Sequence, residues 1–283
     1  MKKTLVILLL IISTKGGLIY AGAFDYVGLG ARAQGMGDAF TAVADDLSSV
    51  IYNPAGLSHI TENEVFVSYR DFYNLGLLTE SHIGLSIPNN NWNVCFSYHR
   101  IGTTDRIKFT NYSENTYYFT VATSLFGVEN FYGGWNFKYH SVISENKASG
   151  YGLDGGLLYK FVEQNINLGL TVSDITGTNI RWDTQTTDNI PLTFRVGASY
   201  NILKNMVASL DYLSNGKINF GTELWLFESQ ILGLRTGASN VFSDKNVLCL
   251  GVSLSFTGIQ IDYAINKHYS LDFTHYLSLH LRI

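Results

Sequence analysis

Three stretches of the sequence alternate between apolar and polar or small residues over about ten positions. In residues 165–173, 217–226 and 276–283, nearly every second residue is Ile, Leu, Val or Phe, and most residues between them are polar, charged or Gly. A period of two places the apolar side chains on one face of a β-strand. Segments of about ten residues with one apolar face are typical of membrane-spanning β-barrels. The pattern predicts an all-β chain.

The same alternation recurs along the chain and predicts a transmembrane antiparallel β-barrel of about 14 strands. Every other connection is short, as in residues 162–165 and 201–205, whereas residues 101–116 and 174–190 form long connections. Bacterial barrels have short periplasmic turns and longer outer loops, and a soluble sandwich has no reason to sort its loops in this way. The expected strands begin near residues 64, 77, 91, 115, 130, 150, 165, 190, 204, 217, 229, 246, 257 and 273.

The first 23 residues match a secretory signal peptide. Lys2 and Lys3 form a basic start, Leu5 to Ile12 is an apolar run, and Ala21-Gly22-Ala23 is an A-x-A cleavage site that makes Phe24 the expected mature start. An apolar run this short cannot span a membrane as a helix. Residues after 23 contain no run of 18 apolar residues, which excludes a helical inner-membrane protein. We therefore expect a protein of the outer membrane of a Gram-negative (diderm) bacterium, surrounded by outer-membrane lipid.

Composition and motifs exclude several functions. Charged residues make up 15% of the chain, against roughly a quarter in soluble domains, and the net charge of −4 offers no nucleic-acid footprint. The expected barrel places Cys95 and Cys249 on distant strands, too far apart for a disulfide. The histidines do not form H-E-x-x-H, and Gly251 to Ser255 misses the G-x-S-x-G elbow. We expect no catalytic residues, no metal, no cofactor and no enzyme activity.

Eight charged residues fall on the polar face of the predicted strands, which faces the lumen of a barrel. Two interpretations stay open for them. They can form ion pairs that hold the interior together, or they can line a substrate path. The eight residues are Lys138, Asp154, Arg195, Asp211, Glu223, Arg235, Asp262 and Arg282.

Residues 24–60 do not alternate and form a separate N-terminal arm. Ala31 to Ala44 is rich in alanine and predicts a helix. Asp45 and Asp46 are placed to cap a second short helix that runs through Ile51. Asn53-Pro54-Ala55-Gly56 predicts a turn. The expected organisation is a signal peptide (1–23), a hatch or plug arm (24–60) and an outer-membrane barrel (61–283).

The arm carries a resemblance to a known family. Residues 30–46 (GARAQGMGDAFTAVADD) and 53–57 (NPAGL) resemble the opening motif of the PorV/PorQ family, whose members are relatives of FadL-type transporters of hydrophobic compounds. The resemblance implies a fourteen-stranded outer-membrane barrel whose arm folds into the lumen as a hatch. The chain departs from the family in being shorter than the type IX secretion members and in ending at Ile283 rather than an aromatic residue. The motif places Gly35, Met36, Gly37, Asp45, Asp46, Asn53, Pro54, Ala55 and Gly56 in the plug.

Two functions follow from these observations. The resemblance implies a non-enzymatic PorV/PorQ-type barrel that acts in envelope transport or type IX-like secretion, with a secretion-system or surface-protein partner. The alternative is a FadL-like channel for uptake or export of a small hydrophobic ligand. An apolar cavity behind residues 31–57 favours the channel. A lumen filled by paired charges, with an apolar patch on the outer loops, favours a scaffold that binds a protein partner.

Overall fold

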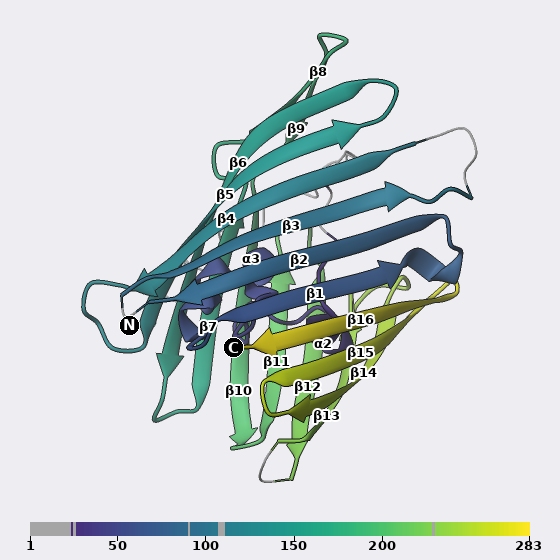
Figure 1. The fold of residues 1–283 in the computed structure, drawn as a ribbon. Helices are drawn as coiled ribbons and strands as arrows, with labels where there is room; N and C mark the ends of the chain where they lie inside the picture. Colours follow the sequence, from purple (N-terminus) through teal and green to yellow (C-terminus); the bar gives the residue numbers. More distant parts are fainter. Residues whose placement is uncertain (1–23, 25–26, 90, 107–110, 228–229) are drawn as a thin grey trace.

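A computed structural model describes residues 24, 27–89, 91–106, 111–227 and 230–283, and the predicted signal peptide lies outside this range. The described chain forms a closed antiparallel barrel with fourteen wall strands, as predicted (Figure 1). Each wall strand pairs with the next, and β1 pairs with β16, with Glu64 opposite Arg282. The wall consists of β1 (Glu64–Asp71), β2 (Leu78–Pro88), β3 (Asn93–Thr103), β4 (Ser113–Ser124), β5 (Phe131–Ile143), β6 (Lys147–Phe161), β7 (Ile166–Ser173), β10 (Thr193–Leu203), β11 (Met206–Leu213), β12 (Ile218–Leu226), β13 (Leu232–Ser239), β14 (Val247–Phe256), β15 (Ile259–His268) and β16 (Phe273–Arg282).

A further hairpin lies inside the connection that the sequence predicted as a long loop. Strands β8 (Thr178–Trp182) and β9 (Thr187–Ile190) pair with each other, and β8 also pairs with β6 above the end of β7. The hairpin therefore extends one side of the wall beyond the neighbouring strands (Figure 1). Its strands are short, which is why the alternation in this stretch did not predict them.

Connection lengths sort by barrel end, but less strictly than predicted. At one end, β10–β11 and β14–β15 are joined by two residues each. At the other end, residues 104–112 and 174–192 are long, yet the β5–β6 turn has only three residues, 144–146. The β5–β6 turn therefore departs from the expected alternation of short and long connections. The arm joins β1 at the short-turn end, which faces the periplasm in bacterial barrels.

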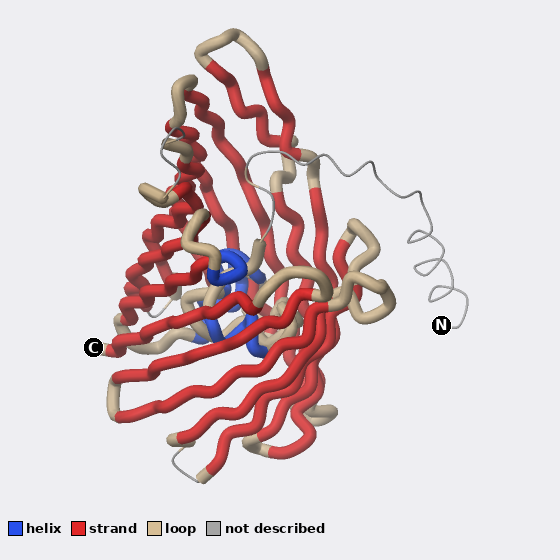
Figure 2. The backbone as a smooth tube through the Cα atoms, turned by 90° about the vertical axis from the view of Figure 1, so that its right-hand side faces the viewer, coloured by secondary structure: helices blue, strands red, loops and turns tan. Residues whose placement is uncertain are grey.

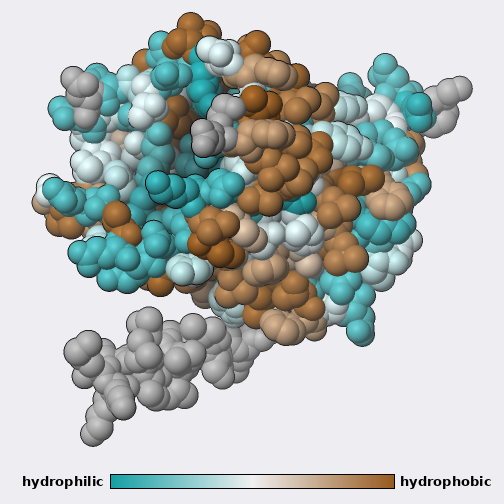
Figure 3. All heavy atoms as spheres, turned by 90° about the horizontal axis from the view of Figure 1, so that it is seen from below, coloured by the Kyte–Doolittle hydropathy of each residue, from teal (hydrophilic) through white to brown (hydrophobic). Residues whose placement is uncertain are grey.

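The outer face of the wall is apolar. Many aliphatic and aromatic side chains on alternate strand positions are 37–58% exposed, and together they form a larger apolar surface than soluble proteins expose to water. Hydrophobic residues gather to the right of the hollow in Figure 3. Representative members of the apolar outer face are Ile83, Leu85, Phe96, Phe119, Phe137, Leu168, Val196, Leu210, Phe220, Leu234, Leu250, Val252, Ile261 and Leu277.

The arm lies inside the barrel, where its helices are enclosed by strands (Figure 2). Its helix α2 (Ala31–Gly35) is much shorter than the predicted helix to Ala44, because Gly37 and Asp38 have positive φ values of 65° and 66°. Helix α3 (Ser49–Tyr52) begins after Ser48, not after the two aspartates. The predicted Asn53–Gly56 turn is part of a 3₁₀ helix, η1 (Pro54–His59).

One further short helix, η2 (Phe72–Asn74), follows β1. Within the described residues, the helices are all too short or too polar to cross a membrane. Cys95 and Cys249 are both buried and free, as the predicted distance between their strands required.

Candidate functional site

The arm supplies the hydrophobic core of the molecule. A barrel turns its apolar wall residues outward, so an apolar core needs another source. Leu29, Met36, Phe40, Leu47 and Leu57 are fully buried and form one cluster inside the lumen. The wall contributes few apolar members to this cluster, among them Phe66 of β1. The arm is thus held by burial of its own apolar side chains.

Inward-facing glycines of the wall let the arm backbone approach closely. A Cβ atom at Gly221 would lie 2.1 Å from the Met36 carbonyl oxygen, and one at Gly237 would lie 2.4 Å from the Met36 carbonyl carbon. A Cβ atom at Gly169 would lie 2.3 Å from the Thr41 carbonyl oxygen. A real Cβ atom does not fit at such distances, so only glycine allows these contacts.

Inward-facing wall glycines also lie against the segment Asn53-Pro54-Ala55. Asn53 Nδ2 donates to the carbonyl oxygens of Thr41 (2.9 Å) and Leu157 of β6 (3.0 Å). Asn53 Oδ1 accepts from the Ala55 backbone N–H (3.1 Å). A Cβ atom at Gly156 would lie 2.2 Å from Asn53 Oδ1, and one at Gly134 would lie 2.3 Å from the Pro54 carbonyl carbon. Asn53 therefore connects two arm segments, around Thr41 and around Ala55, to strand β6 of the wall.

Arg32 of α2 connects the arm to a chain of wall charges. Its guanidinium group contacts Asp45 (2.5 Å), Asp46 (3.0 Å) and Glu223 (2.8 Å). Burial lowers the pKa of Arg32, but the carboxylates of Asp45, Glu223 and Asp46 more than offset it, so the pKa lies well above its usual value. Arg32 bonds to both oxygens of Glu223, and Arg235 Nε bonds to one of them, Oε2 (2.5 Å). Arm and wall thus share one carboxylate.

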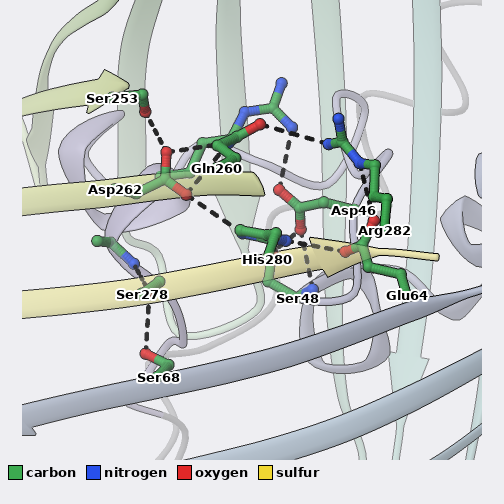
Figure 4. A network of polar contacts seen from close by, with 12 residues as sticks. Asp46, Ser48, Glu64, Ser68, Ser253, Gln260, Asp262, Ser278, His280 and Arg282 are labelled. Atoms are coloured by element: carbon green, nitrogen blue, oxygen red, sulfur yellow. Dashed lines mark hydrogen bonds and ion pairs between the residues drawn. The ribbon is translucent and has the colours of Figure 1, made fainter. Parts of the chain in front are cut away.

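The chain of charges continues around the wall to β1 (Figure 4). Arg235 contacts Asp262 (3.3 Å), and His280 lies between Asp262 (3.2 Å) and Glu64 (2.8 Å). Arg282 also contacts Glu64 (3.3 Å), but its side chain is 40% exposed at the rim of the lumen. Seven of the eight predicted lumen charges are buried, and Arg282 is the exception.

Two further groups of charges hold the arm and the outer half of the lumen. Asp211 accepts hydrogen bonds from the backbone N–H groups of Phe40 and Thr41 (3.0 Å each), and it pairs with Arg195 (3.1 Å). Lys138 lies 2.7 Å from both Asp154 and Asp174. All of the predicted lumen charges therefore lie in ion pairs.

Several further polar residues of the wall face the lumen and were not predicted from the sequence. Arg70 of β1 pairs with Glu80 of β2 (2.6 Å), and Glu80 also contacts His99 of β3 (2.5 Å). The phase of the alternation in β1 and β2 could have identified these residues, since Phe66, Ser68 and Arg70 share one face. Other inward-facing polar residues that were not predicted are Glu64, His82, Asn136, His140, Asp174 and His280.

A polar cavity of about 520 Å³ opens at the short-turn end, between the arm and the wall. The arm lines it with Arg32, Val43 and Asp45, and the wall adds Lys160, Lys204 and several amides. The view from below shows hydrophilic residues around a hollow (Figure 3). Such a lining suits water and polar groups better than an apolar molecule.

His59 marks where the arm leaves the lumen. Its Nδ1 atom lies 3.2 Å from the Gly56 carbonyl oxygen, and its ring packs against Tyr132. Burial, together with the nearby charge of Lys160, lowers the pKa of His59 to about 4. Among the residues described, no three His, Cys, Asp or Glu side chains are grouped to hold a metal ion.

Comparison with known sequences finds no match. No protein-family model matches the chain, and no curated protein matches it.

Comparison with solved structures finds the same barrel. The toluene transporter TodX of Pseudomonas putida superposes with a TM-score of 0.69 at 12% identity, covering 93% of this chain and 100% of TodX. The monoaromatic hydrocarbon channel CymD gives 0.68 at 12% identity, with 92% and 99% covered. A FadL homologue of Pseudomonas aeruginosa gives 0.61 at 10% identity, with 92% and 100% covered. At these identities the likeness establishes a shared fold.

Fold and surface together give the location of the protein. A closed barrel with an apolar outer belt and a polar interior belongs in a lipid bilayer, and such barrels occur in outer membranes. The protein is therefore an outer-membrane protein of a Gram-negative bacterium.

Proposed function

We propose that the protein is a non-enzymatic outer-membrane channel for small hydrophobic compounds, with residues 27–60 as its plug. The observation that carries this proposal is the shared fold. The chain spans all of TodX and nearly all of CymD, which are described as a toluene transporter and a monoaromatic hydrocarbon channel. Because the fold is shared, we assign this barrel and its arm the same class of cargo as those two proteins, a small apolar molecule.

In this proposal, the described arrangement of arm and wall is the closed form of the channel. Arm side chains such as Phe40, Leu47 and Leu57 are fully buried, and the cavity at the short-turn end is polar. An apolar compound needs an apolar surface along its route. Passage therefore requires a shift of the arm that exposes these side chains to the lumen.

A second candidate is a scaffold that binds a protein partner. Its support is the lumen itself, because the inward charges are paired with one another and with the arm. A lumen filled in this way needs no cargo. The resemblance of residues 30–46 and 53–57 to PorV/PorQ proteins adds a role in type IX-like secretion to this candidate, with a secretion-system or surface protein as partner.

One purification distinguishes the two candidates. The protein is extracted from native outer membranes in mild detergent, and mass spectrometry identifies the small molecules and proteins that accompany it. A stoichiometric apolar molecule that is lost from the Asn53→Ala variant supports the channel. An empty barrel that brings secretion-system proteins with it, unchanged in this variant, supports the scaffold and contradicts the channel.

A further inference from the structure

Phe24 lies at the long-loop end of the lumen and is bound there by both its backbone and its ring. Its backbone nitrogen is 2.7 Å from Glu114 Oε2 on β4. Its ring lies 4.4 Å from the His140 ring, measured between centroids. It also packs against a buried cluster of Val142, Ala148 and Ile180. Phe24 therefore occupies a site that is acidic on one side, at Glu114, and apolar on the other.

Glu114 is arranged to receive a positively charged group. Tyr112 donates its hydroxyl hydrogen to Glu114 Oε1 (2.6 Å), so the carboxylate is oriented and its other oxygen faces Phe24. The distance of 2.7 Å to the Phe24 nitrogen is typical of a charge-assisted hydrogen bond. A neutral amide uses this site only partly, because it brings one N–H group and no charge.

The backbone of Phe24 gives an independent indication. Its φ angle is 65°, in the left-handed region that bulky aromatic residues rarely adopt. The first residue of a chain has no φ constraint, because no carbonyl carbon precedes its nitrogen. The conformation that fits this site therefore suits a chain that starts at Phe24 better than one that passes through it.

We propose that the mature chain begins at Phe24 and that Glu114 binds its α-ammonium group. Signal peptidase hydrolyses the Ala23–Phe24 bond with one water molecule. Ala23 leaves as a carboxylate, and the Phe24 nitrogen becomes an ammonium group that retains the released proton. This group donates to Glu114 while the Phe24 ring sits on the apolar cluster. Glu114 is a positioning residue that fixes the start of the arm.

The consequence is that the arm is tied at both ends of the lumen. Phe24 is held at the long-loop end, and the other end of the arm continues into β1 at Glu64, by the short turns. A segment fixed at both ends loses less entropy on docking than one with a free end. The site therefore links removal of the signal peptide to seating of the arm.

The first test uses the unaltered protein from outer membranes. Mass spectrometry of the mature chain is expected to show Phe24 as its first residue. Treatment with a water-soluble carbodiimide, which joins adjacent amines and carboxylates, is expected to give a peptide in which the Phe24 α-amine is bonded to the Glu114 side chain. A mature start elsewhere, or failure of this cross-link to form, overturns the proposal.

The second test measures the reactivity of the α-amine. An ammonium group held by a carboxylate stays protonated and reacts slowly with 2-pyridinecarboxaldehyde, which modifies N-terminal amines. We expect Glu114→Gln to raise the labelling rate about tenfold, the change that corresponds to one pKa unit. Glu145→Gln is the control, because Glu145 is exposed in the β5–β6 turn. Equal rates in wild type and Glu114→Gln, with heat-modifiable migration showing intact barrels, contradict the proposal.

Discussion

The charged residues in the lumen form ion pairs, and this pairing decides whether each one stabilises or destabilises the folded barrel. A buried carboxylate without a partner costs several kcal/mol, so each one here has a cation or backbone N–H groups within bonding distance. Glu223 has two cationic partners, Arg32 from the arm and Arg235 from the wall. The sequence placed these wall residues on the correct face because alternation fixes the face. It could not give their partners, which lie on other strands or on the arm.

The wall glycines give the sharpest prediction at this scale. We expect Gly221→Val to displace the arm while the barrel still forms, because the new Cβ would overlap the Met36 carbonyl oxygen. Overpacking of this kind costs about 1–3 kcal/mol. Arg32 supplies the only tryptic site between residues 27 and 63. Trypsin cleavage after Arg32, measured by mass spectrometry, is expected to be faster in Gly221→Val. The control is Thr222→Ala on the outer face, which should match wild type.

His59 predicts a pH dependence of arm seating. Its pKa is about 4 when docked and about 6.5 when released, so the released form binds more protons between these values. The contribution of His59 to docking is present above pH 6.5 and is lost as the pH falls toward 4, by at most about 3 kcal/mol. Hydrogen exchange of residues 27–60, corrected for intrinsic rates, should increase from pH 7 to pH 5. A His59→Gln variant should lack this part of the increase, and identical profiles in both proteins would exclude the role of His59.

At the level of elements, the wall was predictable and the arm was not. Strand positions follow from local alternation, which each strand carries in its own sequence. Helices of five residues or fewer, such as α2 and α3, carry no such pattern, and isolated helices of this length are not stable. Their form is set by the space that wall glycines leave, which depends on residues far away in sequence. The β8–β9 hairpin was missed because it is short.

Asn53 joins several elements, and its loss tests how they hold together. Asn53→Ala removes the side-chain donor to the Thr41 and Leu157 carbonyl groups and the acceptor of the Ala55 backbone N–H. This is expected to cost about 1–3 kcal/mol of docking energy, and so to speed cleavage after Arg32 about tenfold or more. Asn167→Ala is a matched control, since Asn167 also faces the lumen and, within the described part of the chain, its side chain bonds to Ser199 of the wall and not to the arm. An unchanged cleavage rate in Asn53→Ala would show that the segment does not hold the arm.

The whole molecule is a barrel whose interior is completed by its own N-terminal segment. The wall supplies apolar surface to the lipid and polar surface to the lumen, and the arm fills the lumen with the apolar core that a barrel of this size otherwise lacks. The plug role of residues 35–37, 45–46 and 53–56 is a proposal that rests on this placement.

A filled lumen predicts low ion conductance. In planar bilayers, the wild-type protein is expected to show few and small openings, because the arm blocks the lumen. Asn53→Ala should open more often, as its arm is held less firmly. A large steady conductance of the wild-type protein would instead indicate an open pore.

The central claim, that small apolar molecules cross this barrel when the arm shifts, is tested most directly by locking the arm. Ala31 of the arm and Ala264 of β15 are buried in one cluster, so we choose these two positions for an engineered cysteine pair, with Cys95 and Cys249 replaced by alanine. Uptake of a labelled monoaromatic hydrocarbon, such as toluene, is then measured in cells that lack other channels of this type. We expect uptake with the reduced protein and none above background with the oxidised protein. Equal uptake in both states, or none in either, would contradict the account.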